Sequence, residues 1–212
     1  MPHQKQTAGV ILAAGMSKRF GQPKQLAKLD NKFLLEWVLD SALASRLAQV
    51  VLVVGHEHPQ IIQALGSKIN HPRLQVVIND RYQQGQSGSL RLGLSNIQKN
   101  FDSVMFILGD QPRLRSSTID FLLGCFWNSE KTICVPVCRG VRGNPTIFSR
   151  TVYADLMTIE GDIGAREIIR TNQEHILYVE LEDPRGFIDI DSQQDLENLK
   201  KRPVKLEDFK SD

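Results

Sequence analysis

The sequence predicts an α/β protein built on a doubly wound, mostly parallel sheet. Short runs of β-branched and other apolar residues recur through the first two thirds of the chain, and stretches with apolar residues at helical spacing lie between them. Strands that are apolar throughout are typical of a parallel sheet, which is buried on both faces. The alternation of the two patterns implies right-handed β-α-β crossovers, with helices on both sides of the sheet.

The first part of the chain supplies the parallel strands and the helices between them. Apolar residues at helical spacing predict helices over 34–43 and 89–97. Pro59 suits the first turn of a third helix, because its φ is fixed near the helical value. The continuous apolar runs predict strands over 10–12, 50–54, 74–78 and 104–108.

The last third of the chain is less regular. A turn at 139–143 separates two apolar runs, so a hairpin-like excursion is expected there. A helix-opening cap is predicted at 192–195, ahead of a short amphipathic stretch. The predicted strands of this part are 132–137, 145–148, 176–181 and 187–190.

Length and composition indicate one globular domain. At 212 residues we expect a single domain over 1–212, with a core from about 8 to 200 and a charged tail at 201–212. The net charge of +2 gives no electrostatic case for binding nucleic acid or an anionic membrane. No apolar run approaches the ~20 residues of a membrane span, and residues 1–8 lack the apolar centre of a secretory signal. A cytoplasmic protein is therefore expected.

The histidines and cysteines do not predict a metal site. His56 and His58 could form a ligand pair, but no third ligand accompanies them in sequence, and a surface turn is the preferred interpretation. The three cysteines, Cys125, Cys134 and Cys138, contain no C-x-x-C pair, so we expect free buried thiols.

Several polar segments should meet at one edge of the predicted sheet. In an open parallel sheet, ligands bind beyond the carboxyl ends of the strands, where loops diverge and helix N-termini point inward. This rule brings together the loop after Leu12, the turn at Gly55, the segment 79–88 and the pair Gly109-Asp110.

The loop after the first strand has the composition of a phosphate cradle. It matches neither G-x-G-x-x-G nor the P-loop pattern. Its small residues Ala13-Ala14-Gly15 let the backbone approach a ligand and donate N–H groups, and Arg19 and Lys24 could neutralise phosphate charge. From the residues alone, an ordinary strand-to-helix turn with solvated cations is an equal alternative.

Carboxylates at the predicted strand ends suggest a cation site. Asp110 follows a fully apolar strand, where an isolated charge is costly, although a turn aspartate before proline is the common alternative. We expect one of Asp189 and Asp191 to face the site and the other to point away, and Asp191, which is nearer the predicted strand end, is the choice. Two carboxylates beside phosphates suit Mg²⁺.

A glycine- and serine-rich segment opens the predicted helix at 89–97. In Gly85-Gln86-Ser87-Gly88-Ser89, the hydroxyls of Ser87 and Ser89 could read a base edge. Such segments are more often simple turns with a helix cap, and that alternative stays open.

Six segments, taken in order, resemble one family. GVILAAGMSKRFGQPKQL, GQSGS, ILGDQP, RGNPTIF, GDIGAR and DIDSQQDL are similar to the MobA-like nucleotidyltransferases, and most similar to the MocA type, the molybdenum cofactor cytidylyltransferases. The resemblance covers residues from about 9 to 199. It implies a Rossmann-like fold of the glycosyltransferase-A type that binds a nucleoside triphosphate with Mg²⁺.

The resemblance also implies a reaction and its residues. Family members of this branch transfer CMP from CTP to the terminal phosphate of molybdopterin and release pyrophosphate, and a recipient molybdoenzyme is the implied partner. The doublet Ala13-Ala14 resembles the cytidylyltransferase form of the loop and favours CTP over GTP. By position, the implied catalytic residues are Arg19, Lys24 and Asp110, the metal ligands are Asp110 and Asp191, and the nucleotide contacts are Leu12, Ala13, Ala14, Gly15, Arg19, Lys24, Ser87, Ser89 and Asp110.

Other functions remain open at this point. Phe20 replaces a methionine common in the family, which should alter packing more than chemistry. Candidates for contacting an anionic acceptor are Lys18, Arg142 and Arg166. A cytidylyltransferase or other nucleotidyltransferase with a different phosphate acceptor would use the same loop, and a non-catalytic carrier of nucleotide or cofactor would not need the pair of aspartates.

Overall fold

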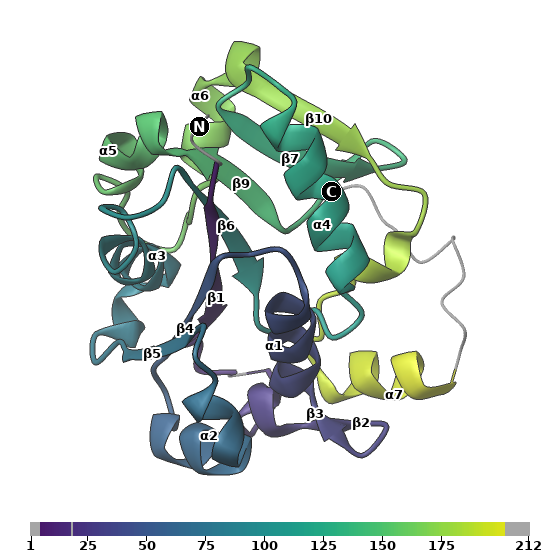
Figure 1. The fold of residues 1–212 in the computed structure, drawn as a ribbon. Helices are drawn as coiled ribbons and strands as arrows, with labels where there is room; N and C mark the ends of the chain where they lie inside the picture. Colours follow the sequence, from purple (N-terminus) through teal and green to yellow (C-terminus); the bar gives the residue numbers. More distant parts are fainter. Residues whose placement is uncertain (1–4, 18, 202–212) are drawn as a thin grey trace.

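The computed structural model describes residues 5–17 and 19–201, and it confirms the predicted fold class. Its main sheet runs in the order β10-β7-β9-β6-β1-β4-β5, with β8 paired to β7 (Figure 1). The central strands are mutually parallel. They are β1 (Thr7–Ala13), β4 (Gln49–Val54), β5 (Leu74–Ile78) and β6 (Ser103–Leu108).

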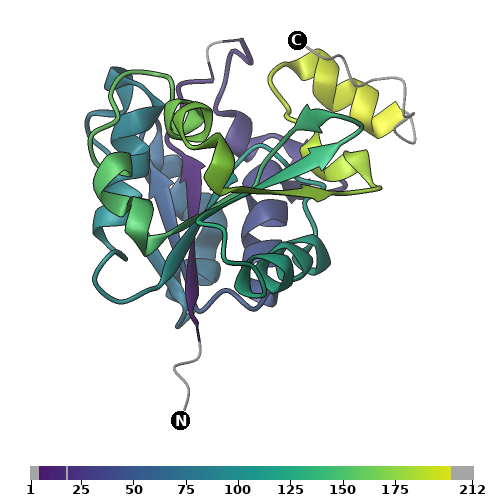
Figure 2. The same cartoon turned by 90° about the horizontal axis from the view of Figure 1, so that it is seen from above.

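Helices cover both faces of this sheet, as Figures 1 and 2 show. One face packs against α1 (Leu34–Ala44), α2 (His58–Leu65) and α4 (Ser116–Trp127). The other packs against α3 (Gln86–Ser95), α5 (Tyr153–Leu156) and α6 (Arg166–Thr171). Alternate residues of each strand enter the two cores, which is why these strands read as continuous apolar runs.

The second half of the sheet contains the expected excursion. β7 (Ile133–Cys138) turns back into the short β8 (Val141–Arg142), and β9 (Thr146–Ser149) lies antiparallel between β6 and β7. β10 (Ile176–Glu180) pairs with β7 in parallel.

The predicted strand at 187–190 is wrong. The chain forms a 3₁₀ turn, η6 (Pro184–Phe187), and then continues without regular structure to α7 (Gln193–Lys201). Pro184 fixes φ and has no N–H to give to a ladder, and the Asp183 carboxylate accepts from the Arg185 N–H at 3.0 Å, which closes the turn instead. A single backbone bond, from Ile190 N to Asp110 O at 3.1 Å, links the segment to the end of β6.

The chain end returns to the first loop. α7 packs over a small apolar cluster that includes Phe20, so the residue at this position fills space between the loop and the C-terminal helix. Apart from Lys201, the predicted tail at 201–212 lies outside the described residues. The members of the cluster are Phe20, Ala27, Leu29, Leu34, Ile190, Leu196 and Leu199.

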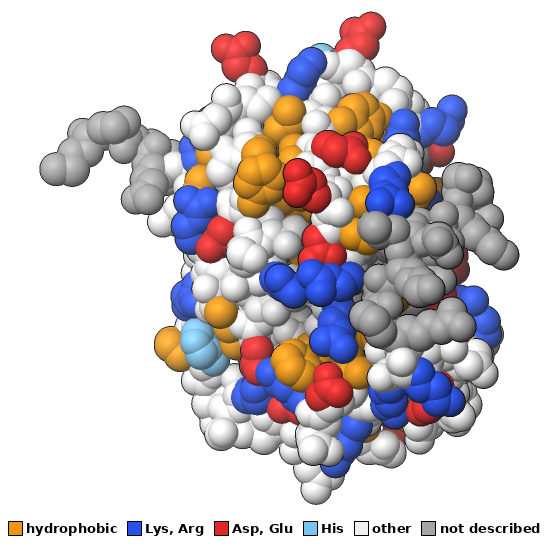
Figure 3. Space-filling model, turned by 90° about the vertical axis from the view of Figure 1, so that its right-hand side faces the viewer, with side chains coloured by type: hydrophobic (Ala, Val, Ile, Leu, Met, Phe, Trp, Pro, Cys, Tyr) orange, Lys and Arg blue, Asp and Glu red, His pale blue; other side chains and the backbone are white. Residues whose placement is uncertain are grey.

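Figure 3 shows basic and acidic side chains interspersed over one face of the molecule. Within the described ranges, no helix has both the length and the apolar character needed to cross a membrane. The elements not yet named are all short: η1 (Lys24–Leu26), β2 (Lys28–Leu29), β3 (Lys32–Phe33), η2 (Gly66–Asn70), η3 (Tyr82–Gln84), η4 (Arg150–Val152) and η5 (Gln173–His175).

Candidate active site

The predicted meeting of loops at the carboxyl ends of the strands is confirmed. The Gly109 N–H donates to Leu12 O at 3.0 Å, so the turn after β6 touches the end of β1. The His56 N–H donates to Ala14 O at 3.4 Å, which joins the turn after β4 to the loop after β1. The Asn79 N–H donates to Val54 O at 2.7 Å and adds the segment after β5.

Two glycines at this edge have opposite surroundings. A Cβ added at Gly15 would meet nothing within 4 Å, so the loop faces open space there. A Cβ at Gly55 would lie 2.7 Å from Tyr82 Cβ and 2.9 Å from Ala14 Cβ. Gly55 therefore allows close packing of two loops, whereas the space over Gly15 is available to a ligand.

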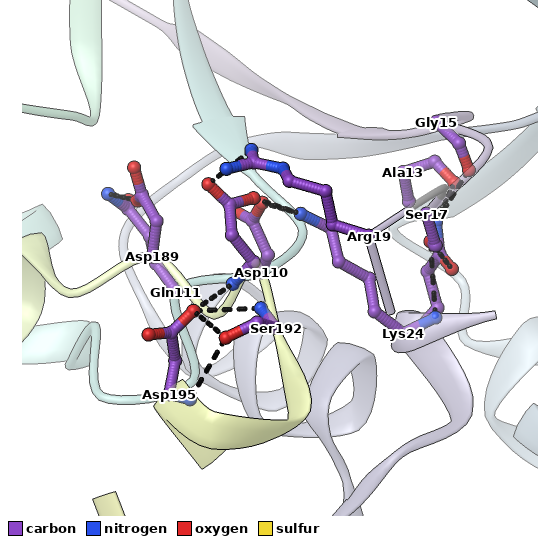
Figure 4. A network of polar contacts seen from close by, with 12 residues as sticks. Ala13, Gly15, Ser17, Arg19, Lys24, Asp110, Gln111, Asp189, Ser192 and Asp195 are labelled. Carbon is purple, nitrogen blue, oxygen red and sulfur yellow. Dashed lines mark hydrogen bonds and ion pairs between the residues drawn. The ribbon is translucent and has the colours of Figure 1, made fainter. Parts of the chain in front are cut away.

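The predicted cations and carboxylates form one cluster. Lys24 Nζ lies 2.5 Å from Asp110 Oδ2 and 3.0 Å from Asp191 Oδ1. Arg19 donates to Asp191 Oδ2 at 2.8 Å. Figure 4 shows Arg19, Lys24 and Asp110 converging from the first loop and from the end of β6. The cluster thus joins residues that are 86 and 167 positions apart in the chain.

Charge attraction outweighs burial in this cluster. Burial lowers the pKa of Lys24, but the Asp110 and Asp191 carboxylates more than offset this, so that pKa lies above its usual value. Burial likewise raises the pKa of Asp191, but Lys24 and Arg19 hold it below the usual range. Lys24 is therefore an ammonium, and Asp191 a carboxylate, at neutral pH.

The donor set fits a divalent cation of the Mg²⁺ kind. Lys24 Nζ already occupies a cation position between two carboxylates. Asp110 Oδ1 is buried and has no hydrogen-bond partner within the described part of the chain. Over residues 5–17 and 19–201, no three His, Cys, Asp or Glu side chains are grouped to hold a metal. A pair of carboxylates, completed by water and phosphate oxygens, is nevertheless the usual Mg²⁺ set.

Asp189 corrects the prediction that only Asp191 of the pair faces the site. Alternation along a strand would place residues two apart on the same side, and the segment 187–190 is not a strand in any case. Asp189 lines a cavity that adjoins the cluster. Its Oδ1 accepts from Gln111 Nε2 at 2.7 Å (Figure 4). Desolvation of its carboxylate raises the pKa of Asp189 to about 6, and the negative charge of Asp110 adds to this shift.

Asp195 supports Asp191 and was not predicted as a site residue. Its Oδ2 accepts from Asp191 N at 3.2 Å, from Ser192 N at 2.8 Å and from Ser192 Oγ at 2.7 Å. One carboxylate oxygen thus fixes the backbone that carries Asp191 at the start of α7. The sequence signal was the Ser192 to Asp195 spacing of a helix cap, whose second role appears only in three dimensions.

The two candidate serines differ in their surroundings. Both lie in the first turn of α3 and are buried. Ser89 Oγ accepts from Asn79 Nδ2 at 2.9 Å, whereas Ser87 Oγ has no partner among the described residues. The Ser87 N–H donates to Gly161 O at 3.1 Å, so the GQSGS and GDIGAR motifs lie together.

A cavity of about 1310 Å³ adjoins the charged cluster. Arg142 and Arg166, two of the predicted acceptor contacts, line it, while Lys18 lies outside the described residues. Asp189 and Gln111 lie on the side of the cavity next to the cluster. Its apolar wall includes Val135, Val141, Ile163, Ile169 and Phe187.

The histidines and cysteines behave largely as predicted. His58 Nδ1 lies 3.1 Å from Gly55 O at the start of α2, in a turn. The three thiols are free: Cys134 and Cys138 are buried and Cys125 is half-buried. Burial raises the pKa of Cys134 to about 12, so this thiol is neutral and unreactive at physiological pH.

Comparison with known proteins identifies the family. The MobA-like NTP transferase domain matches residues 9–176 of this chain. The chain belongs to this family. It is therefore an enzyme, a nucleotidyltransferase, as predicted.

Relatives with different names are similar to this nucleotidyltransferase. The purine catabolism protein PucB of Bacillus subtilis is 27% identical over 91% of this chain and 95% of its own length. A probable molybdenum cofactor guanylyltransferase of Pyrococcus furiosus is 28% identical over 91% and 95%. The molybdenum cofactor cytidylyltransferase of Escherichia coli is 23% identical over 93% and 97%.

Solved structures share the fold. Rv0371c of Mycobacterium tuberculosis superposes with a TM-score of 0.81 at 26% identity, covering 93% of this chain and 98% of its own. Its complex with manganese superposes with a TM-score of 0.78 at 25% identity, covering 93% and 99%.

Proposed function

We propose that this protein transfers CMP from CTP to the terminal phosphate of molybdopterin, releasing pyrophosphate, with Mg²⁺ as cofactor. The observation that carries the proposal is the Lys24 ammonium between Asp110 and Asp191, at the same edge of the sheet as the open space over Gly15. A cation site beside an accessible backbone loop suits nucleotidyl transfer, because this chemistry depends on positioning and charge stabilisation.

The basic side chains have two roles in this proposal. In the ligand-free protein, Arg19 and Lys24 neutralise the aspartates. A bound triphosphate offers them a more highly charged partner, so we infer that both turn from the carboxylates to the phosphates and stabilise the departing pyrophosphate. Asp110 and Asp191 are then free to hold Mg²⁺, which when bound neutralises charge at the α-phosphate.

The acceptor needs no dedicated general base. An oxygen of its terminal phosphate is already anionic at neutral pH, so it can attack the α-phosphorus directly while the bond to pyrophosphate breaks. No proton has to be removed in this step. The cavity supplies what such an acceptor needs, namely apolar wall for a ring system and the guanidinium groups of Arg142 and Arg166 for anionic groups.

The nucleotide base and the acceptor are assigned from further observations. The Ala13-Ala14 doublet supports CTP, and Ser87, with its unpartnered hydroxyl, is the proposed base contact. The relatives include proteins named for both cytidylyl and guanylyl transfer, and PucB is named for purine catabolism, which favours a different acceptor as the second candidate. We place the reaction in the cytoplasm, with a molybdoenzyme as the recipient of the product.

The proposal is tested by measuring pyrophosphate release with Mg²⁺ and each of CTP, GTP, ATP and UTP, with and without molybdopterin. We expect release that requires both CTP and the pterin. Asp110→Asn should lower the rate on the order of hundreds-fold, whereas Asp155→Asn, which changes an exposed carboxylate on α5, should not. Release with another nucleotide or another acceptor would overturn that part of the assignment, and an Asp110→Asn enzyme of normal rate would overturn the site.

A further inference from the structure

One buried amide lies beneath the candidate phosphate loop. The side chain of Gln25 is only 3% exposed. Its Nε2 donates to Ala13 O at 2.9 Å and reaches Gly15 O at 3.4 Å, and its Oε1 accepts from Ser17 Oγ at 3.4 Å. A single side chain therefore contacts every second residue of the loop, at Ala13, Gly15 and Ser17.

These contacts determine which way the loop peptides face. In a trans peptide unit, the carbonyl of one residue and the N–H of the next point in opposite directions. Because Gln25 draws the carbonyls of Ala13 and Gly15 toward the interior, the N–H groups of Ala14 and Met16 are turned away from it. The open space over Gly15 lies on the exposed side of this loop.

The same network reaches Lys24. The backbone N–H of Lys24 donates to Ser17 Oγ at 3.2 Å, and that hydroxyl in turn donates to Gln25. The loop and the backbone of Lys24 are therefore tied together by one small group of hydrogen bonds, and the Lys24 side chain starts from that fixed backbone. The loop N–H groups and the Lys24 ammonium are the two halves of the candidate phosphate site.

We propose that Gln25 is a positioning residue for the triphosphate. Its amide holds the 13–17 loop in the orientation in which backbone N–H groups face the phosphates, and it acts on the nucleotide only through that loop and Lys24. The inference rests on the proposed function to the extent that the ligand is a nucleoside triphosphate. The alternative is that Gln25 is a core amide that supports the fold and nothing else.

The test compares triphosphate with nucleoside binding. Titration calorimetry with Mg²⁺ would give the affinities of CTP and of cytidine for the wild type, Gln25→Glu and Gln25→Leu. Both substitutions remove the Nε2 donor to the carbonyls of Ala13 and Gly15. Gln25→Glu has the same size and shape as glutamine, so it serves as the test variant if Gln25→Leu does not fold. The matched control is Gln75→Leu, which removes a half-buried amide on β5 bonded to Gln49 and Asn96.

We expect the Gln25 variants to bind CTP about ten- to a hundredfold more weakly, which corresponds to losing one or two hydrogen bonds from loop N–H groups to the charged phosphates. Their affinity for cytidine should stay within about twofold of the wild type. Gln75→Leu should leave the ratio of the two affinities unchanged. Equal losses for CTP and cytidine, or no loss, would overturn the positioning role in favour of a purely structural one.

The outcome for the wild type separates this inference from the proposed function. If the wild type prefers another nucleotide, the CTP assignment fails, and the same ratio measured with that triphosphate and its nucleoside still decides the role of Gln25. If the wild type binds no triphosphate more tightly than its nucleoside, both proposals are wrong.

Discussion

Lys24→Met should make the protein bind a divalent cation more tightly while it binds nucleotide more weakly. In the ligand-free protein, the Lys24 ammonium occupies the position between Asp110 and Asp191 that the metal would take. Methionine has similar length and no charge. The substitution therefore removes the internal competitor and leaves two carboxylates facing one site.

The magnitude follows from the two contacts that Lys24 makes. The contact with Asp110 is largely buried, with side-chain exposures of 16% and 17%, and a charge-assisted bond of this kind is worth about 1.5–3 kcal/mol net. The contact with Asp191 adds less, because that carboxylate is 38% exposed and solvent screens it. Since 1.4 kcal/mol corresponds to a factor of ten, metal affinity should rise roughly ten- to a hundredfold.

Mn²⁺ is a suitable probe, because electron paramagnetic resonance measures the concentration of the free ion. The titration needs neither nucleotide nor enzyme turnover. Arg19→Met is the graded control. Its guanidinium is 75% exposed, so removing its bond to Asp191 should change Mn²⁺ affinity by only a fewfold. Triphosphate affinity should fall in both variants. Unchanged or weaker Mn²⁺ binding by Lys24→Met would refute the idea that lysine and metal compete for the same carboxylates.

Further expectations concern backbone space and surface charge. Gly15→Ala should keep the thermal midpoint within about 2 °C of the wild type, because the added Cβ meets nothing within 4 Å. It should weaken triphosphate binding, because the same Cβ would occupy the space proposed for the phosphates. Gly55→Ala should instead cost about 1–3 kcal/mol of stability, because its Cβ would lie 2.7 Å from a neighbouring side-chain carbon; equal midpoints for the two variants would contradict this contrast. Burial raises the pKa of Asp40, but ion pairs with Lys32 and Lys68 outweigh it and hold that pKa below its usual value. The stabilisation of the folded state by these ion pairs is therefore present above about pH 4 and is lost as the pH falls below it. Asp40→Asn should therefore cost up to about 1 kcal/mol in urea unfolding at pH 7 and less at pH 3, and an equal cost at both would exclude the ion pairs as its source.

The elements predicted best are those whose pattern is local. Beyond their first residues β1, β4 and β6 are apolar on both faces, and β5 is interrupted only by Gln75, so these runs are visible in any short window of sequence. The error at 187–190 has the same origin. Three apolar residues and one aspartate near a proline resemble a short strand, and whether a neighbouring strand is there to pair with them cannot be read from the segment itself.

The site was predictable as a set of residues but not as an arrangement. Asp110 could be named from its position at a strand end, and Lys24 as a cation that follows the small-residue loop after the first strand. Their direct contact depends on how segments distant in sequence pack, which no local pattern records. Gln25 and Asp195 were missed as supporting residues for the same reason, since a glutamine after a lysine or an aspartate in a helix cap carries no sign of a second role.

The small apolar cluster beneath α7 has a consequence for the order in which the protein becomes competent. Residues on α7 pack against Phe20 and its neighbours, and Asp191 enters the site just before that helix begins. During synthesis, the sheet strands through β6, the loop and Asp110 all leave the ribosome well before Asp191 does. A nascent chain can thus build the sheet edge that carries Asp110 early, but the second carboxylate joins it only when the last helix docks.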